Sequence, residues 1–134
     1  MKKKEVKDML MWDVIIEEKD YWWPVCWKCI IDPDCIDNIV VVKESPHNPY
    51  ARGEAEVWTT ESGKEVKLHE NEVAYEYKLD EFLVFLEDLS RDRDVCVRAG
   101  EWFKDDYLDP RIVEIVEKLR EVGAWFASYY EMID

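Results

Sequence analysis

The chain has 134 residues, of which 48% are hydrophobic and 13% aromatic, and its formal net charge is −14 at pH 7. This length and this supply of apolar side chains suit one folded domain over 1–134 and exclude a disordered chain. The acidic surplus opposes the charge neutralisation on which nucleic-acid binding depends, so we expect no nucleic-acid partner. No apolar run reaches the roughly 18 residues of a membrane span, so we expect no membrane insertion.

The segments that flank the cysteine-rich region give two predictions. A helix from about residue 3 to residue 12 fits the apolar spacing, although 12–16 also suits a strand. The β-branched run at 38–43 is short enough to be a buried strand.

The segment 22–35 is the most distinctive part of the sequence, because it holds three of the four cysteines and three of the seven tryptophans. Pro24 suits the first turn of a helix, in which Cys26 and Cys29 would share a face at i and i+3. The alternative is an extended stretch in which alternate side chains point to one side. Both conformations stay open at this point.

The cysteines allow four interpretations. Cys26, Cys29 and Cys35 could hold zinc, which prefers four Cys or His ligands in a tetrahedron, with His47, His69 or Cys96 as the fourth ligand. The same cysteines could form a disulfide, in which case one pair must lie close enough to bridge, or could act as a redox pair. They could also be buried thiols that fill space as small hydrophobes. No other cofactor is expected.

The clearest sheet pattern lies at 54–78. Three segments alternate apolar and polar residues, a short turn at Gly63 separates the first two, and together they predict a three-stranded meander. The side chains expected to face the core are Ala55, Val57, Val66, Leu68, Val73, Tyr75 and Tyr77.

Two helices and a short strand complete the predicted fold. A helix near 79–90 is capped by Asp80, and 95–98 is a short strand. Asp109 is a cap followed by a proline at the first helical position, and apolar residues at three- and four-residue steps extend this helix over 110–131. The sequence therefore predicts an α+β fold, in which helices pack on a mainly antiparallel sheet.

One pattern of carboxylates suggests an enzyme. Asp34, Glu65 and Lys67 match a short arrangement by which many nucleases hold Mg²⁺ and place a lysine beside the attacked phosphate. Such a short pattern arises easily by chance, and an acidic field attracts DNA poorly. A divalent-metal nuclease is therefore an alternative, as is a regulator stabilised by a metal or a disulfide at the cysteines.

The aromatic residues near the C-terminus favour an interaction role. Trp125, Phe126, Tyr129 and Tyr130 are the expected interface of a homodimer, and the surplus of carboxylates favours a basic protein partner. The many charged residues and the absence of Gln point to a thermophile or its virus. No signal sequence is visible, so we expect an intracellular, cytoplasmic protein. The main prediction is a non-enzymatic, acidic protein-interaction or regulatory module.

Overall fold

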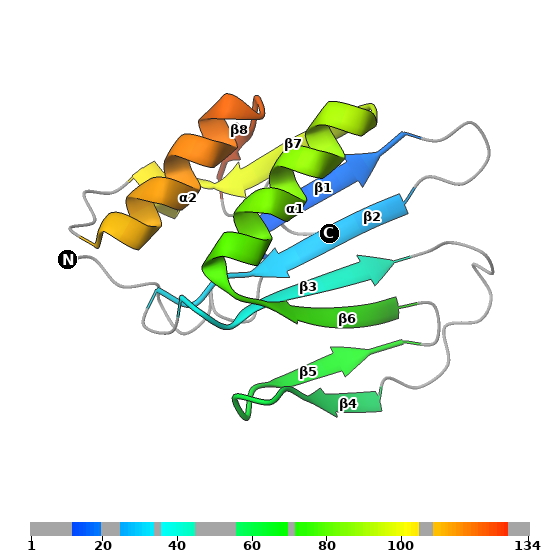
Figure 1. Ribbon diagram of the computed structural model, residues 1–134. Helices are drawn as coiled ribbons and strands as arrows, with labels where there is room; N and C mark the ends of the chain where they lie inside the picture. Colours follow the sequence, from blue (N-terminus) through cyan, green and yellow to red (C-terminus); the bar gives the residue numbers. More distant parts are fainter. Residues whose placement is uncertain are drawn as a thin grey trace.

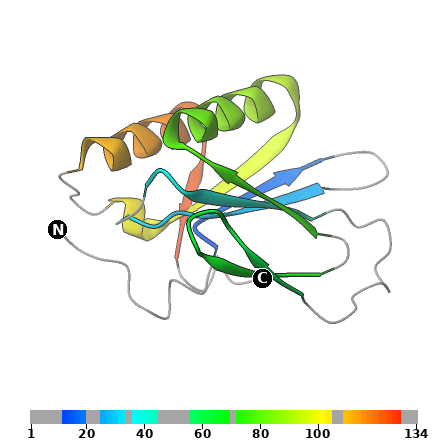
Figure 2. The ribbon, with the colours of Figure 1, turned by 60° about the horizontal axis from the view of Figure 1, so that its bottom comes forward.

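The computed structural model describes residues 12–19, 25–33, 36–44, 56–69, 72–104 and 109–128. These segments form three layers, with two helices on one side of a six-stranded sheet and a two-stranded hairpin on the other side (Figures 1 and 2). The predicted α+β class with a mainly antiparallel sheet is confirmed. Within the described segments, no helix is long and apolar enough to cross a membrane.

The large sheet has the strand order β6-β3-β2-β1-β7-β8. Its strands are β1 (Val14–Glu18), β2 (Val25–Ile30), β3 (Ile39–Glu44), β6 (Glu72–Tyr77), β7 (Val95–Gly100) and β8 (Trp125–Ala127). All neighbouring strands are antiparallel except β7 and β8, which are parallel. The short predicted strands at 38–43 and 95–98 are therefore confirmed as β3 and β7.

Two helices cover one face of the sheet (Figure 2). They are α1 (Leu79–Asp92) and α2 (Pro110–Glu121), and the short 3-10 helix η2 (Glu101–Lys104) follows β7. Their buried residues are Leu79, Phe82, Leu86, Leu89, Ile112, Ile115, Val116 and Leu119, at the predicted helical spacing. The N-cap of α1 is Lys78 rather than Asp80, whose side chain lies in the first turn.

The hairpin of β4 (Glu56–Thr59) and β5 (Glu65–Leu68) forms as predicted, with Gly63 at a φ of +91° in the turn. The predicted meander is wrong, because β6 pairs with β3 and not with β5. The hairpin instead packs its Val66 against Val40 and Val42, on the sheet face opposite the helices. β5 therefore lies against the second face of the sheet, which it helps to bury, and not alongside the edge strand β6.

The change of partner also alters which side chains are buried. Val57, Val73 and Tyr75 were expected in the core but are 57%, 52% and 39% exposed. In the hairpin, Trp58 packs toward the sheet, so its neighbour Val57 must point outward. Val66 is buried as expected, Leu68 and Tyr77 are partly buried, and residue 55 lies outside the described segments.

The cysteine-rich region adopts the extended alternative. Residues Val25–Ile30 form β2, so of the two conformations that the sequence allowed, the strand is the one observed. β1 starts at Val14, which agrees with the strand alternative for 12–16, whereas the helix predicted before residue 12 lies outside the described segments.

The last helix is shorter than predicted: α2 ends at Glu121, ten residues before the predicted end at 131. Gly123 has a φ of +80°, which glycine adopts without steric cost, and its N–H donates to the carbonyl of Arg120 at 3.1 Å. The N–H of Ala124 donates to the carbonyl of Leu119 at 2.8 Å, completing a Schellman motif. The chain then runs as β8 beside β7.

Candidate functional site: an aromatic groove beside helix α1

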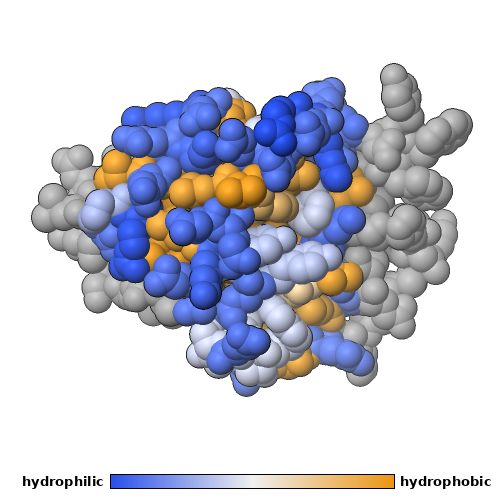
Figure 3. Space-filling view, in the orientation of Figure 1, coloured by the Kyte–Doolittle hydropathy of each residue, from blue (hydrophilic) through white to orange (hydrophobic). Residues whose placement is uncertain are grey.

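A groove of about 480 Å³ lies on the helix side of the sheet, between α1 and the edge strand β6. Its lining residues come from β2, β6, α1 and the segment after α1, and they are Trp27, Tyr75, Tyr77, Glu81, Val84, Phe85, Asp88, Leu89, Asp92 and Arg93. Pale and apolar surface is visible between α1 and the lower strands in Figure 3. The groove therefore combines aromatic rings with charged groups from one helix face.

The floor of the groove follows from the pleat of the strands. Trp27 pairs with Lys43, and Lys43 pairs with Val73, so these side chains form one row across three strands on the helix side. Tyr75 and Tyr77 follow on the same side of β6. The exposed fractions of Val73 and Tyr75 show that the helices leave this edge of the sheet uncovered.

The aromatic rings of the groove hold one another in place. Phe85 on α1 meets Trp27 edge to face, with 5.2 Å between ring centroids, and lies 5.5 Å from Tyr77. The rings of Tyr75 and Tyr77 are nearly parallel, with 6.1 Å between centroids. Such pairs stabilise the fold beyond simple burial, and together the rings form a continuous aromatic wall.

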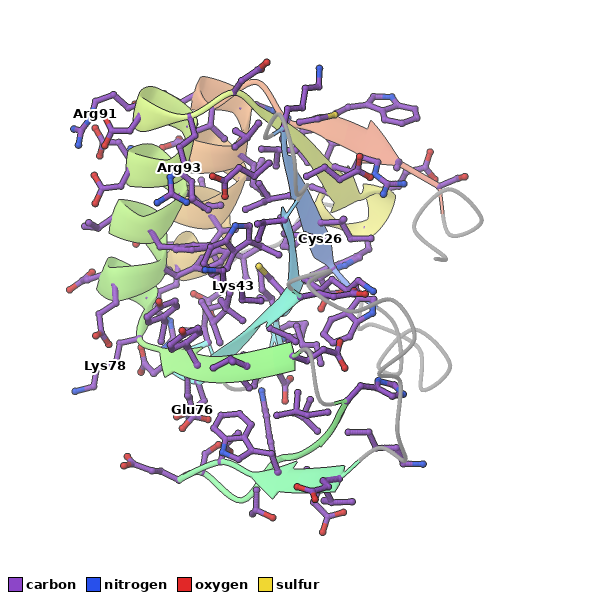
Figure 4. All side chains as sticks on the ribbon, turned by 90° about the vertical axis from the view of Figure 1, so that its right-hand side faces the viewer. Cys26, Lys43, Glu76, Lys78, Arg91 and Arg93 are labelled. Carbon is purple, nitrogen blue, oxygen red and sulfur yellow. The ribbon has the colours of Figure 1, made fainter. Side chains whose placement is uncertain are left out.

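One face of this wall already attracts a cation of the same chain. The ammonium nitrogen of Lys43 lies 5.1 Å from the centroid of the Trp27 ring, within the range of a cation–π interaction. The indole N–H of Trp27 donates to Glu18 at 3.3 Å, and Glu18 pairs with Arg93 at 2.9 Å. Figure 4 shows Lys43 and Arg93 on the α1 side of the sheet.

Carboxylates form the rim that α1 contributes. Glu81, Asp88 and Asp92 all line the groove and are all exposed. Asp88 and Asp92 also contact Arg91, at 2.9 and 3.3 Å, while Arg93 is paired with Glu18. The lining residues thus contain three carboxylates and one guanidinium, and the ammonium of Lys43 lies beside them on Trp27. An excess of negative charge remains, which favours a positively charged ligand.

Tyr77 lines the groove together with this acidic rim. Partial burial raises the pKa of its phenol, and the nearby Tyr75, Glu81 and Cys29 raise it further. The phenol therefore stays uncharged at neutral pH, so Tyr77 can attract a cation only through the face of its ring.

The paired candidate metal ligands Cys26 and Cys29, which lie within the described segments, are not brought together. Cys26 and Cys29 point to opposite faces of β2, because side chains an odd number of positions apart on a strand lie on opposite sides of the sheet. No disulfide joins Cys26, Cys29 and Cys96, so the expected disulfide is absent among the described cysteines. The described residues also include no group of three or more His, Cys, Asp and Glu that could hold a metal. Cys35 and His47 lie outside the described segments.

Two of the three candidate nuclease residues are placed by the structure. Glu65 and Lys67 alternate on β5 and share its exposed outer face, opposite the buried Val66. Asp34 lies outside the described segments. A strand of the observed pattern exposes both charges to water without requiring any catalytic role.

The candidate interface residues divide between two faces of β8. Trp125 is 53% exposed, whereas Phe126 packs against the main core under the helices. Tyr129 and Tyr130 lie outside the described segments.

Sequence reasoning missed the groove because it assigned Tyr75 and Tyr77 to the core. The sequence does contain a pattern that indicates the rim. Glu81, Asp88 and Asp92 are separated by seven and four residues, which places them on one face of a helix. An acidic stripe on α1 can therefore be predicted, but the aromatic strand opposite it cannot.

No protein-family model, no curated protein and no solved structure matches this chain.

Proposed function

We propose that this chain is a non-enzymatic protein-interaction module that binds a basic segment of a partner protein in the groove between α1 and β6. The observation that carries the proposal is the aromatic wall with a carboxylate rim. A lysine or arginine side chain can lay its apolar stem and its charge on the rings, while its donors reach the carboxylates. The net charge of −14 would also attract a basic partner over a distance.

Charge favours a basic partner over a second copy of this chain in the groove. A copy would bring its own acidic surface to the rim of Glu81, Asp88 and Asp92, and like charges at an interface are unfavourable. The homodimer predicted from the C-terminal aromatics would therefore use a different surface, at β8.

Binding can be measured with a labelled probe peptide of four arginines alternating with four valines, followed by fluorescence anisotropy. A peptide with glutamate in place of arginine is the charge control. The double variant D88N/D92N removes two carboxylates from the groove rim. The double variant D80N/E87Q removes two exposed carboxylates from the same helix outside the groove, so it changes the net charge equally.

We expect the arginine peptide to bind and the glutamate peptide not to bind. D88N/D92N should weaken binding about tenfold, or about 1.4 kcal/mol, since each lost carboxylate is worth up to about 1 kcal/mol at such a site. D80N/E87Q should change the affinity less than about threefold. Equal weakening by the two variants would show a general attraction to an acidic surface and would overturn the groove as the site.

A further inference from the structure

We infer that the basic segment binds as an additional β-strand along the outer edge of β6, an inference that rests on the function proposed above. β6 is one edge of the six-stranded sheet, and among the described strands only β3 pairs with it. An extended peptide can pair its main chain with such an edge and place alternate side chains in a neighbouring pocket. The groove lies directly beside this edge.

The outward-facing backbone groups of β6 can be identified. The N–H of Glu72 donates to the carbonyl of His69 at 3.0 Å, so it points away from Glu44, its partner residue on β3. Backbone groups alternate along a strand, so those of Ala74 and Glu76 also face outward. Those of Val73 and Tyr75 then face β3.

The hairpin leaves this edge open to a peptide. β5, which precedes β6 in the chain, lies beneath the sheet, where its Val66 packs on Val40 and Val42. The side chain of Glu76 points to the hairpin and accepts a hydrogen bond from Ser62 at 2.9 Å (Figure 4). The hairpin is thus fixed on the second face of the sheet rather than alongside β6.

On its groove side, β6 lacks the usual protection of an edge strand. Exposed edges commonly carry charged side chains, proline or a bulge that prevents pairing with another chain, and in β6 the charges of Glu72 and Glu76 lie on the opposite face. β6 (Glu72–Tyr77) contains neither lysine nor proline, and it exposes Val73 and Tyr75 beside the edge. Two exposed apolar side chains next to an open edge are expected where a strand is added.

The register of an added strand explains why the ligand should be basic. Side chains opposite Val73, Tyr75 and Tyr77 would lie on the groove side, about 5 Å from these residues, and would reach the carboxylates of α1. Side chains of the alternate set would lie opposite Glu72, Ala74 and Glu76. Side chains on both faces of the added strand would therefore meet carboxylates. Only those on the groove side would also meet the aromatic rings.

Two N-methylated forms of the arginine–valine probe test the inference. One form carries N-methyl groups on all the valines and the other on all the arginines. Alternate N–H groups of a strand point to opposite sides, so only one form can still pair with β6. We expect one form to bind within about twofold of the unmodified peptide, and the other to bind at least about tenfold more weakly because it loses several main-chain hydrogen bonds.

Amide hydrogen exchange of the protein locates the added strand. Binding of the unmodified probe should slow the exchange of Ala74 and Glu76 by about tenfold or more, while the amides of β8, at the opposite edge, should not change. Equal binding of the two methylated forms, or unchanged exchange at Ala74 and Glu76, would overturn strand addition and leave groove binding intact. Slower exchange that depends on protein concentration without any peptide would show that a second copy occupies the edge, which also overturns it. If the unmodified probe does not bind, the proposed function itself fails.

Discussion

Asp13 joins three distant parts of the chain through a carboxylate that is only 2% exposed. One oxygen accepts the N–H of Ile31, just after β2, at 2.7 Å, and the other accepts the indole N–H of Trp102 in η2 at 3.0 Å. Its backbone N–H and C=O bond to Cys29 and Gly100 at 2.8 and 2.9 Å. A buried carboxylate is stable only when its oxygens are satisfied in this way.

Replacing Asp13 with alanine should lower the free energy of unfolding by about 3 kcal/mol, since two buried donors lose their acceptor. Asparagine should cost less, about 2 kcal/mol, because its single carbonyl oxygen can still accept one donor. Urea unfolding followed by tryptophan fluorescence measures both values. An alanine variant within about 0.5 kcal/mol of wild type would show that the hydrogen bonds of Asp13 do not stabilise the fold.

The described cysteines should differ sharply in reactivity. Complete burial raises the pKa of the Cys29 thiol well above its ordinary value, and nearby Asp13 and Cys26 raise it further. Cys96 is exposed on β7 and Cys26 is partly buried. Because the thiolate is the reactive form, iodoacetamide should modify Cys96 first and Cys29 only after unfolding. Peptide mass spectrometry over time measures the order, and early modification of Cys29 in the folded protein would contradict it.

At the scale of the elements, α2 has well-defined signals at both ends. Asp109 accepts the N–H of Arg111 at 2.9 Å and Pro110 occupies the first turn, as the sequence predicted. The same carboxylate contacts the guanidinium of Arg111 at 3.1 Å. Hydrogen bonds from Arg111 lower the pKa of Asp109 below its ordinary value of 3.8.

Asp109→Ala should lower the free energy of unfolding at neutral pH by about 1 kcal/mol, which is typical of a lost N-cap. Because the folded pKa is lowered, the stabilisation by the charged form is complete above the ordinary value of 3.8 and is lost as the pH falls through the folded value. The difference between wild type and variant should therefore shrink in strong acid. Asp109→Asn keeps a capping oxygen and is the matched control. Urea unfolding at several pH values would contradict this account if the difference grew in acid.

At the scale of the whole molecule, the charges are organised into networks despite the acidic surplus. Lys118 of α2 contacts Glu87 of α1 at 3.6 Å and Glu121 at 3.3 Å. Arg111 contacts Asp37 at 3.7 Å as well as Asp109. Each exposed pair contributes little at room temperature, but networks of this kind gain in value as the temperature rises. The expectation of a thermophile, which rests on composition, stays a prediction.

We expect the isolated protein to self-associate through β8, because Trp125 is 53% exposed on an edge strand. Light scattering should give about twice the chain mass of 16.1 kDa, and Trp125→Glu should return it to the monomer value. Val57→Glu is the matched control, because Val57 is equally exposed but lies on the hairpin. A mass of 16.1 kDa at all concentrations would contradict the homodimer.

Strand patterns predicted secondary structure better than they predicted pairing. The alternation at 54–78 located β4, β5 and β6, because an apolar and polar alternation is a local pattern that favours the extended conformation of its own segment. It did not distinguish a meander from the observed arrangement, since alternation has the same period whichever strand lies alongside. The apolar spacing near Phe126 is likewise compatible with a helix or a strand, and the Schellman motif at Gly123 decided between them.

The candidate sites show the same division. The spacing of Cys26 and Cys29 would bring them together in a helix or a turn, and the formation of β2 placed them on opposite faces instead. The acidic stripe of α1 can be read from spacing alone. Its function in a groove depends on Tyr75 and Tyr77, which come from a strand that pairs with β3.

The sequence by itself determined the α+β class, the hairpin turn at Gly63, the buried stripes of both helices and the start of α2, because these depend on contacts within a few residues. The tertiary structure decided the partner of β6, the end of α2, the faces of the cysteines and the existence of the groove. These features depend on which apolar face becomes buried against which distant segment. Burial of the second sheet face beneath the hairpin left β6 as an edge, and that edge forms one side of the groove.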